Sequence, residues 1–323
     1  MKAAVQTAYG APDVVKITEI AKPVPKSGEV LVRIVATTVT SGDSRLRAFR
    51  IPAAFWLPAR LFMGITKPRK SVLGSEFSGI VEAVGAGVTR LKTGDRVFGM
   101  HVYDAHAQYK VVPQTAAITA LPQGMDFAEA AALPFGALTA LHFLRLAKIA
   151  PGQKVLINGA SGAVGSFAVQ LARHFGAEVT GVCSERNLDM VRALGADHVI
   201  DYGQTDFSRN GIQYDVIMDT VDTVSFAQFE RATPPTGQLI ASNAGGGMML
   251  RAGLRKLLGG RQIIVGVAGE LLADIETLRD LAAAGVLRAT IDSRVPFTEI
   301  AKAHALVDSG RKRGAVVVEV SAP

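Results

Sequence analysis

The sequence predicts an α/β protein whose second part contains a doubly wound parallel sheet, and three observations carry this prediction. Short apolar runs alternate with helical patterns from residue 154 onward, as in β-α-β units with right-handed crossovers. A glycine-rich turn, KVLINGASGAVG (154–165), joins the first of these runs to a helix. At 323 residues, the chain also exceeds the size at which a single hydrophobic core stops growing, so we expect two domains.

The first 120 residues have the pattern of β structure. Apolar runs at 30–37, 78–85 and 109–113 are separated by Gly, Pro and Asp, which are typical of turns. The pattern changes near residue 125, where an Ala- and Leu-rich helical stretch runs from 126 to about 148. We therefore expect a β-rich first domain and a boundary close to residue 125.

The parallel sheet is expected to follow that boundary. Its predicted strands cover 154–158, 177–183, 198–202, 214–220, 237–242 and 261–267. Beyond residue 268 the pattern predicts a helix (273–284), a strand near 288–295, a helix (298–308) and a last strand (315–320). We expect this tail to return to the first domain.

Composition and charge narrow the class of protein. The hydrophobic fraction is 49% and the charged fraction 20%, which is typical of a soluble globular protein, and no apolar run is long enough to span a bilayer. The net charge of +7 comes from scattered residues, which indicates solvated basic loops rather than a nucleic-acid surface; a mild attraction for anionic ligands is the alternative. The N-terminus has no apolar signal region, and a single cysteine, Cys183, suits a reducing compartment, so a cytoplasmic location is expected.

The glycine-rich turn predicts a dinucleotide-binding loop. Such a loop needs backbone N–H groups at a helix N-terminus and no Cβ where the pyrophosphate approaches. Gly162 provides the close approach and Gly165 the close packing of helix on strand, whereas Ala160 replaces the usual first glycine, which is tolerable if its φ is negative. The predicted contacts are Ala160, Ser161, Gly162, Ala163, Val164 and Gly165.

The residues after the second predicted strand bear on the choice between NADP(H) and NAD(H). An NAD site usually has an acidic residue there, which binds the ribose 2′-hydroxyl. This chain reads Ser184-Glu185-Arg186, and a hydroxyl next to a guanidinium suits a 2′-phosphate. We expect NADP(H); NAD(H) is the alternative if Glu185 points inward.

The motifs, taken in order, resemble those of the zinc-free medium-chain dehydrogenase/reductases, the quinone oxidoreductase group. The resemblance covers essentially the whole chain and rests on MKAAV (1–5), GEVLVRI (28–34), LGSEFSGIVEAVGAGVTRLKTGDRVFG (73–99), AALPFGALTALHFL (131–144), ASGAVG (160–165) and LGADHVIDY (194–202). It implies a GroES-like β-barrel catalytic domain (1–124 and 268–323) and a Rossmann coenzyme domain (125–267). It also implies a homodimer joined through the strand 261–267.

The resemblance also implies further cofactor contacts. Thr139 is expected near the nicotinamide carboxamide, and Tyr202 beside the adenosine phosphate. Arg311 or Arg313 of the tail is expected to approach the same phosphate, with Arg313 as the candidate. Ser242, Asn243 and Val267 are expected beside the nicotinamide ribose and ring.

The zinc ligands of the related alcohol dehydrogenases are missing from the sequence. Their G-H-E motif reads Gly74-Ser75-Glu76 here, and the first domain contains no cysteine. His101 and His106 are five apart, a spacing without clear metal logic, so we expect structural or surface histidines and no metal site. Hydride transfer from NADPH to a quinone or to the C=C of an α,β-unsaturated carbonyl is the predicted reaction, since a conjugated acceptor needs less polarisation. A zinc-free alcohol/carbonyl dehydrogenase and a non-catalytic NADPH-binding protein are the alternatives.

Residues 44–70 and the preceding turn are the least family-like part of the first domain. The family often has an Asn where this chain has Thr40, which keeps a hydroxyl donor. The segment 44–70 mixes aromatic residues, including Phe49 and Trp56, with arginines. It has three interpretations: a helical insert that packs an apolar face on the barrel, a hydrophobic wall over the substrate, or a contact with a membrane surface. The candidate residues of the substrate pocket are Thr40, Phe49 and Trp56.

Overall fold

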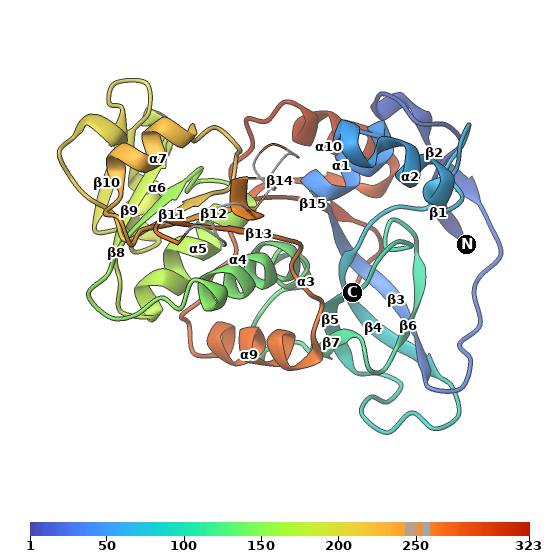
Figure 1. The fold of residues 1–323 in the computed structure, drawn as a ribbon. Coiled ribbons are helices and arrows are strands. Elements are labelled where there is room, and N and C mark those ends of the chain that lie inside the picture. The colour runs from blue at the N-terminus through green and yellow to red at the C-terminus, as the bar shows by residue number, and fades with distance from the viewer. Residues whose placement is uncertain (243–246, 248–250, 254–258) are drawn as a thin grey trace. The chain divides into compact units, whose positions relative to one another are not determined.

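The computed structural model describes residues 1–323 apart from 243–246, 248–250 and 254–258 (Figure 1). The chain forms two compact units, Met1–Phe135 with Glu270–Pro323, and Gly136–Gly269. The C-terminal tail therefore belongs to the same compact unit as the first 135 residues. Residues 125–135, expected in the coenzyme domain, belong to the first unit, because Phe127 and Ala131 pack against Val35 and Val317.

The first unit is built on antiparallel β structure with one parallel pair. Among the described residues, a seven-stranded sheet runs β14-β15-β3-β4-β5-β7, with β6 paired to β3, and β1 and β2 form a separate pair. Strand β15 runs antiparallel to β3 and parallel to β14, which attaches the tail to the sheet. The strands are β1 (Lys2–Gln6), β2 (Val15–Glu19), β3 (Glu29–Val39), β4 (Glu76–Val84), β5 (Arg96–Met100), β6 (Tyr109–Pro113), β7 (Ala117–Ala120), β14 (Ile291–Pro296) and β15 (Ala315–Glu319).

Helices cover parts of this sheet. Helix α10 packs on β15 through Ile300, Ala303 and Val307. The helix expected over 126–148 is two helices, because Pro134 lacks an N–H group and its ring disfavours helix in the preceding residue. The helical elements are η1 (Pro12–Val14), α1 (Ser41–Ala48), α2 (Ala53–Met63), α3 (Phe127–Ala131), α9 (Leu272–Ala283), η4 (Phe297–Glu299) and α10 (Ile300–Asp308), while α4 (Pro134–Leu146) begins where the first unit ends.

The second unit is the predicted doubly wound sheet. Its described strands are all parallel, in the order β10-β9-β8-β11-β12-β13, and its core contains Leu156, Val182, Ile217 and Leu239. The α/β fold class is therefore confirmed. The elements are β8 (Lys154–Asn158), α5 (Ala163–His174), β9 (Glu178–Cys183), η2 (Glu185–Asn187), α6 (Leu188–Ala193), β10 (His198–Asp201), η3 (Phe207–Arg209), β11 (Val216–Asp219), α7 (Phe226–Ala232), β12 (Gln238–Ala241) and β13 (Gln262–Val265).

Candidate nucleotide-binding site

The loop between β8 and α5 is held against the next strand by its own backbone. The amides of Gly159 and Ala160 both donate to the carbonyl of Val182, at 3.0 Å each. Gly159 has a φ of +79°, which favours glycine, and a Cβ there would lie 2.5 Å from the Thr220 hydroxyl. Ala160 is fully buried and is not among the described residues with positive φ, so alanine is accommodated at this position.

The two later glycines have different roles. A Cβ on Gly165 would lie 2.1 Å from the Gly159 carbonyl oxygen, so glycine allows the helix to pack closely on the loop. A Cβ on Gly162 would meet only that same oxygen, at 3.3 Å, so the protein itself leaves this side of the loop open. Openness beside a backbone turn is what an approaching pyrophosphate requires.

Helix α5 begins without the usual protein groups that satisfy a helix N-terminus. Its N-cap is Gly162, which provides no side-chain cap, and its first turn has no acidic residue among the described residues. The first amides of a helix have no intrahelical acceptor and carry a partial positive charge. The start of α5 therefore fits an anionic group such as a pyrophosphate.

A buried asparagine, missed in the sequence analysis, connects this loop to the end of β9. The carboxamide nitrogen of Asn187 donates to the hydroxyls of Ser161 and Ser184, at 3.1 Å each. Its carboxamide oxygen is buried and has no partner among the described residues, so it offers an acceptor for a ribose hydroxyl. Ser184 thus lies beside the loop, whereas Glu185 and Arg186 are exposed.

The carboxyl ends of the neighbouring strands carry a second polar network that the sequence analysis also missed. Asn158, the last residue of β8, donates to the carboxylate of Asp219 at 2.9 Å and to the hydroxyl of Thr223 at 2.8 Å. Asp219 also accepts from the amide of Val224 at 2.7 Å, which holds the turn after β11. Polar residues at the ends of two buried apolar strands were a usable signal, because ligands bind at this edge of a parallel sheet.

Three other expected contacts lie near these strand ends. Ser242 follows β12, and its hydroxyl donates to the carbonyl of Asp219 at 3.1 Å. Tyr202 is 66% exposed, and its amide donates to the Cys183 carbonyl at the end of β9. Thr139 lies on α4 three residues after Gly136, where a Cβ would be 2.3 Å from the Ala163 carbonyl oxygen; the helical period places Thr139 on that same side. Their contacts with a cofactor stay predictions.

Three expected cofactor contacts remain, and they stay predictions. Val267 follows β13 and is 91% exposed. Arg313 belongs to the first unit, where its guanidinium lies 3.9 Å from the carboxylate of Asp292. Asn243 lies outside the described residues.

Cys183 ends β9 beside the loop but is not a reactive thiolate. Burial, and then the nearby Asp201 carboxylate, raise the pKa of its thiol to about 11. A thiol with such a pKa stays protonated near neutral pH, so it is a poor nucleophile.

The first unit holds a buried carboxylate at the start of α4. Glu76 accepts from the Thr38 hydroxyl and, at 2.6 Å, from the amide of Phe135. Burial raises the pKa of Glu76 to about 7, although the Thr38 and Phe135 hydrogen bonds and the charge of Lys312 favour the ionised form. Glu76 therefore connects β3, β4 and α4, and it can hold a proton near neutral pH.

Thr40 has a structural task that competes with its expected place at the substrate. Its hydroxyl donates to the Asp43 carboxylate at 2.6 Å and accepts from the Asp43 amide, forming a capping box at the start of α1. Asp43 also accepts from the amide of Gly74 at 3.1 Å. The hydroxyl proton expected for a substrate is thus already donated within the protein.

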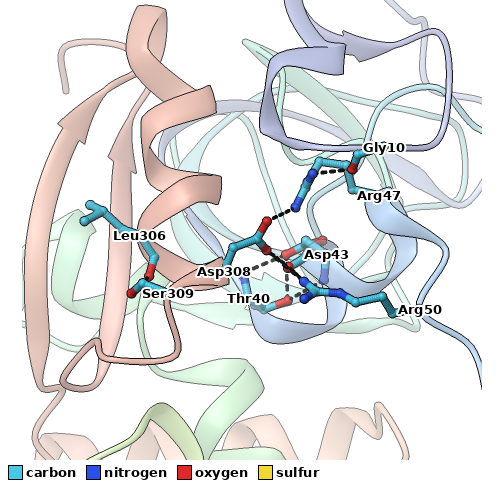
Figure 2. A network of polar contacts seen from close by, with 9 residues as sticks. Gly10, Thr40, Asp43, Arg47, Arg50, Leu306, Asp308 and Ser309 are labelled. Carbon is cyan, nitrogen blue, oxygen red and sulfur yellow. Dashed lines mark hydrogen bonds and ion pairs between the residues drawn. The ribbon is translucent and has the colours of Figure 1, made fainter.

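In the first unit, a further polar network joins α1 to α10 (Figure 2). Asp308 accepts from the buried guanidinium of Arg47 at 2.5 Å and from that of Arg50 at 2.8 Å, and Ser44 also donates to it. Arg47 donates as well to the Gly10 carbonyl at 2.5 Å. Burial alone would raise the pKa of Asp308, but these donors and cations hold it below its usual range.

The two histidines considered as metal ligands have different surroundings. His106 is buried, and its Nε2 lies 2.9 Å from the Thr38 carbonyl oxygen. His101 is partly exposed, and burial lowers its pKa. Across the part of the chain that the structure describes, no group of three His, Cys, Asp or Glu side chains is placed to hold a metal ion.

The segment 44–70 contains the second half of α1 and all of α2, and its two candidate pocket residues lie in an aromatic cluster. Phe49 is buried and contacts the rings of Tyr9 and Trp56 edge-on, and the guanidinium of Arg60 lies 3.9 Å from its centroid. Trp56 is about half exposed. The interpretation of a helix that packs its apolar face on the barrel is wrong for α2, since its large apolar residues face solvent.

Comparison with known proteins shows the family. Residues 26–142 match the alcohol dehydrogenase GroES-like domain, and residues 194–318 match a zinc-binding dehydrogenase domain. The chain is 31% identical to a chloroplastic quinone-oxidoreductase homolog of Spinacia oleracea, over 96% of this chain and 95% of that protein. It is 29% identical to an NADPH-dependent alkenal/one oxidoreductase of Arabidopsis thaliana, over 98% of this chain and 79% of that protein.

A solved structure agrees with this. The quinone oxidoreductase from Coxiella burnetii superposes with a TM-score of 0.87 at 27% identity, and 99% of each chain is covered. The GroES-like and Rossmann parts that the sequence motifs implied are therefore both present. The chain belongs to the medium-chain dehydrogenase/reductase family, in its zinc-free quinone oxidoreductase-like group.

Proposed function

We propose that this chain is an NADPH-dependent reductase that transfers hydride to a quinone or to the C=C bond of an α,β-unsaturated carbonyl compound. The observation that carries the proposal is the uncapped start of α5, which Asn187 connects to Ser184 at the end of β9. The names of the relatives, a quinone oxidoreductase homolog and an NADPH-dependent alkenal/one oxidoreductase, support the same class of reaction.

The loop and the end of β9 divide the binding of the cofactor between them. The first amides of α5 bind the pyrophosphate, and Gly162 leaves room for it. Ser184 and Arg186 hold the ribose 2′-phosphate, because a hydroxyl and a guanidinium donate hydrogen bonds to it and the guanidinium offsets its charge. Asn187 orients both serines and accepts from a ribose hydroxyl.

Bound NADPH supplies the hydride. The chain's part is to position the acceptor, exclude water and stabilise charge on the acceptor's carbonyl oxygen through backbone or hydroxyl donors. A conjugated acceptor suits this chain because Ser75 stands where the zinc-dependent relatives have a histidine ligand.

Steady-state oxidation of NADPH with three classes of acceptor tests the proposal. We expect turnover with quinones or enones, little with matched saturated ketones, and a higher kcat/KM for NADPH than for NADH. Turnover of saturated ketones alone would establish a carbonyl dehydrogenase instead. Tight NADPH binding without turnover of any acceptor would establish a non-catalytic binding protein.

Two further properties belong to this proposal. Strand β13 is the last strand of the described parallel sheet, so its free edge suits pairing with a second copy into a homodimer. Light scattering on the purified protein checks this, and a monomeric mass would contradict it. The single buried cysteine suits a cytoplasmic location, which cell fractionation checks.

A further inference from the structure

A surface helix usually packs its apolar residues inward and exposes its charged residues, but helix α2 does the opposite. Leu57, Leu61 and Phe62 face solvent, and Phe62 is 79% exposed. The only charged residue of the helix, Arg60, points inward over the rings of Phe49 and Tyr9, at 3.9 and 4.6 Å from their centroids. Soluble proteins rarely leave a contiguous apolar face in water, so this face fits a partner that is itself apolar.

The charges around this face point to the chemistry of the partner. Between residues 44 and 70 the chain has seven Lys and Arg residues and no Asp or Glu. Arg47 and Arg50 pair with Asp308, and Arg60 lies over aromatic rings, so the charge beside α2 comes mainly from residues 67–70. Beyond α2, the amide of Arg69 donates to the Met63 carbonyl at 2.8 Å, which folds the basic turn back against the end of the helix. Lys67, Arg69 and Lys70 are all exposed there; the last lies 3.9 Å from the carboxylate of Asp104.

A cavity lies where the apolar face meets this basic turn. Its volume is about 290 Å³, and Phe62, Arg69, Lys70, Tyr9 and Tyr103 are among the residues that line it. The two cations and the phenol of Tyr103 can donate hydrogen bonds to a phosphate group, whereas the Tyr9 hydroxyl already donates to the Met63 carbonyl at 3.0 Å. The aromatic ring of Phe62 borders the apolar side. Such a cavity fits the head group of an anionic lipid whose acyl chains extend along α2.

We propose that the outer face of α2, with the basic turn 67–70 and the adjoining cavity, docks this protein on an anionic lipid bilayer. The apolar residues enter the interfacial region, and the lysines and arginine contact the head groups. The described residues include no helix long and apolar enough to cross a membrane, so the contact is peripheral. The proposal does not depend on the proposed reductase activity, and either can fail without the other.

The chain carries its own reporter for this test. Trp56 is the only tryptophan, lies on α2 and is about half exposed, so its emission shifts to shorter wavelength if the helix enters a bilayer. Full-length protein is titrated with vesicles of phosphatidylcholine containing phosphatidylglycerol, and with phosphatidylcholine alone. We expect the shift and cosedimentation with the anionic vesicles only, and weaker binding at high salt.

Two variants separate the apolar from the basic contribution. Leu61→Ser with Phe62→Ser should abolish cosedimentation, whereas Val24→Ser with Leu271→Ser, two exposed apolar residues elsewhere, should not. Lys67→Glu with Arg69→Glu should weaken binding about 25-fold or more, since each cation near an anionic surface contributes about fivefold. The control for total charge is Arg209→Glu with Lys302→Glu, whose side chains are also well exposed.

The outcomes that overturn the proposal are distinct. Failure of the unsubstituted protein to bind anionic vesicles, or equal binding to both kinds of vesicle, refutes it directly. If the serine pair binds vesicles normally but changes the molecular mass or the KM for soluble acceptors, α2 is a dimer contact or a substrate wall. Equal losses in both charge variants would show attraction by net charge alone. Circular dichroism checks that each variant is folded.

Discussion

Two glycine-to-alanine substitutions, in the nucleotide loop and in the first turn of α5, are predicted to differ in their effect on stability. In Gly165→Ala the new Cβ lies 2.1 Å from the Gly159 carbonyl oxygen, far inside ordinary contact, which begins at 3.4 Å. Because the new Cβ on α5 meets backbone atoms of the loop rather than the end of a flexible side chain, the clash should cost about 1–3 kcal/mol of unfolding free energy, as overpacking does. In Gly162→Ala the nearest atom is at 3.3 Å and φ is −79°, so stability should change by less than about 0.5 kcal/mol.

The same pair should differ in cofactor affinity for a separate reason. The Cβ of Gly162→Ala enters the space proposed for the pyrophosphate, and the loss of one hydrogen bond to a charged group costs about 1.5–3 kcal/mol. The Kd for NADPH should therefore rise about 10- to 150-fold. Thermal unfolding measures stability, and fluorescence titration of bound NADPH measures Kd. A Gly162→Ala protein that binds NADPH like the unsubstituted chain would refute the placement of the pyrophosphate.

Three further predictions concern the cofactor phosphate, a buried carboxylate and the network between α1 and α10. Ser184→Asp, with Arg186 retained, should lower kcat/KM for NADPH about tenfold or more without lowering that for NADH, because a carboxylate repels the 2′-phosphate; equal losses for both would contradict the NADP assignment. Folding raises the pKa of Glu76 from 4.5 to about 7. The contribution of the protonated Glu76 carboxyl to the free energy of unfolding is therefore fully present below pH 4.5 and is lost as the pH rises through 7. Urea unfolding of Glu76→Gln, compared with the unsubstituted chain, should show a difference of about 3 kcal/mol developing across that window; a difference independent of pH would contradict it. Asp308→Ala leaves the buried Arg47 without its carboxylate and should destabilise the protein by about 3 kcal/mol, whereas loss of an exposed pair, as in Asp189→Ala, should cost about 0–1 kcal/mol; equal, small losses would show that the network contributes little.

Local sequence was sufficient for most of the second unit. Six apolar runs, each bounded by turn residues, became the six described parallel strands, with ends within two residues of those expected. The hydrophobic period of these strands and their alternation with helices depend only on residues close in sequence, so both can be predicted without the tertiary structure. The prediction of one helix over 126–148 is wrong in one respect, because Pro134 divides this stretch into two helices.

The functional site could be predicted from the sequence less completely than the fold. The phosphate loop could be located, since strand, glycines and helix are consecutive, but Asn187 could not be assigned a role. Its contacts with Ser161 and Ser184 span 26 and 3 residues, and only the parallel pairing of β8 with β9 brings these three side chains together. Likewise, Glu76 was recognised only by its place in a motif, whereas its burial and raised pKa follow from packing.

The sequence by itself determined the order of the elements, the loop that starts α5 and the absence of the family's histidine and cysteine ligands. These depend on neighbouring residues and on residue type alone. Only the tertiary structure decided which side of α2 faces water, because helical period cannot distinguish the inner from the outer face when nearly every residue is apolar. Arg60 packs over aromatic rings supplied by Tyr9 and Phe49, and this contact turns the remaining apolar residues outward.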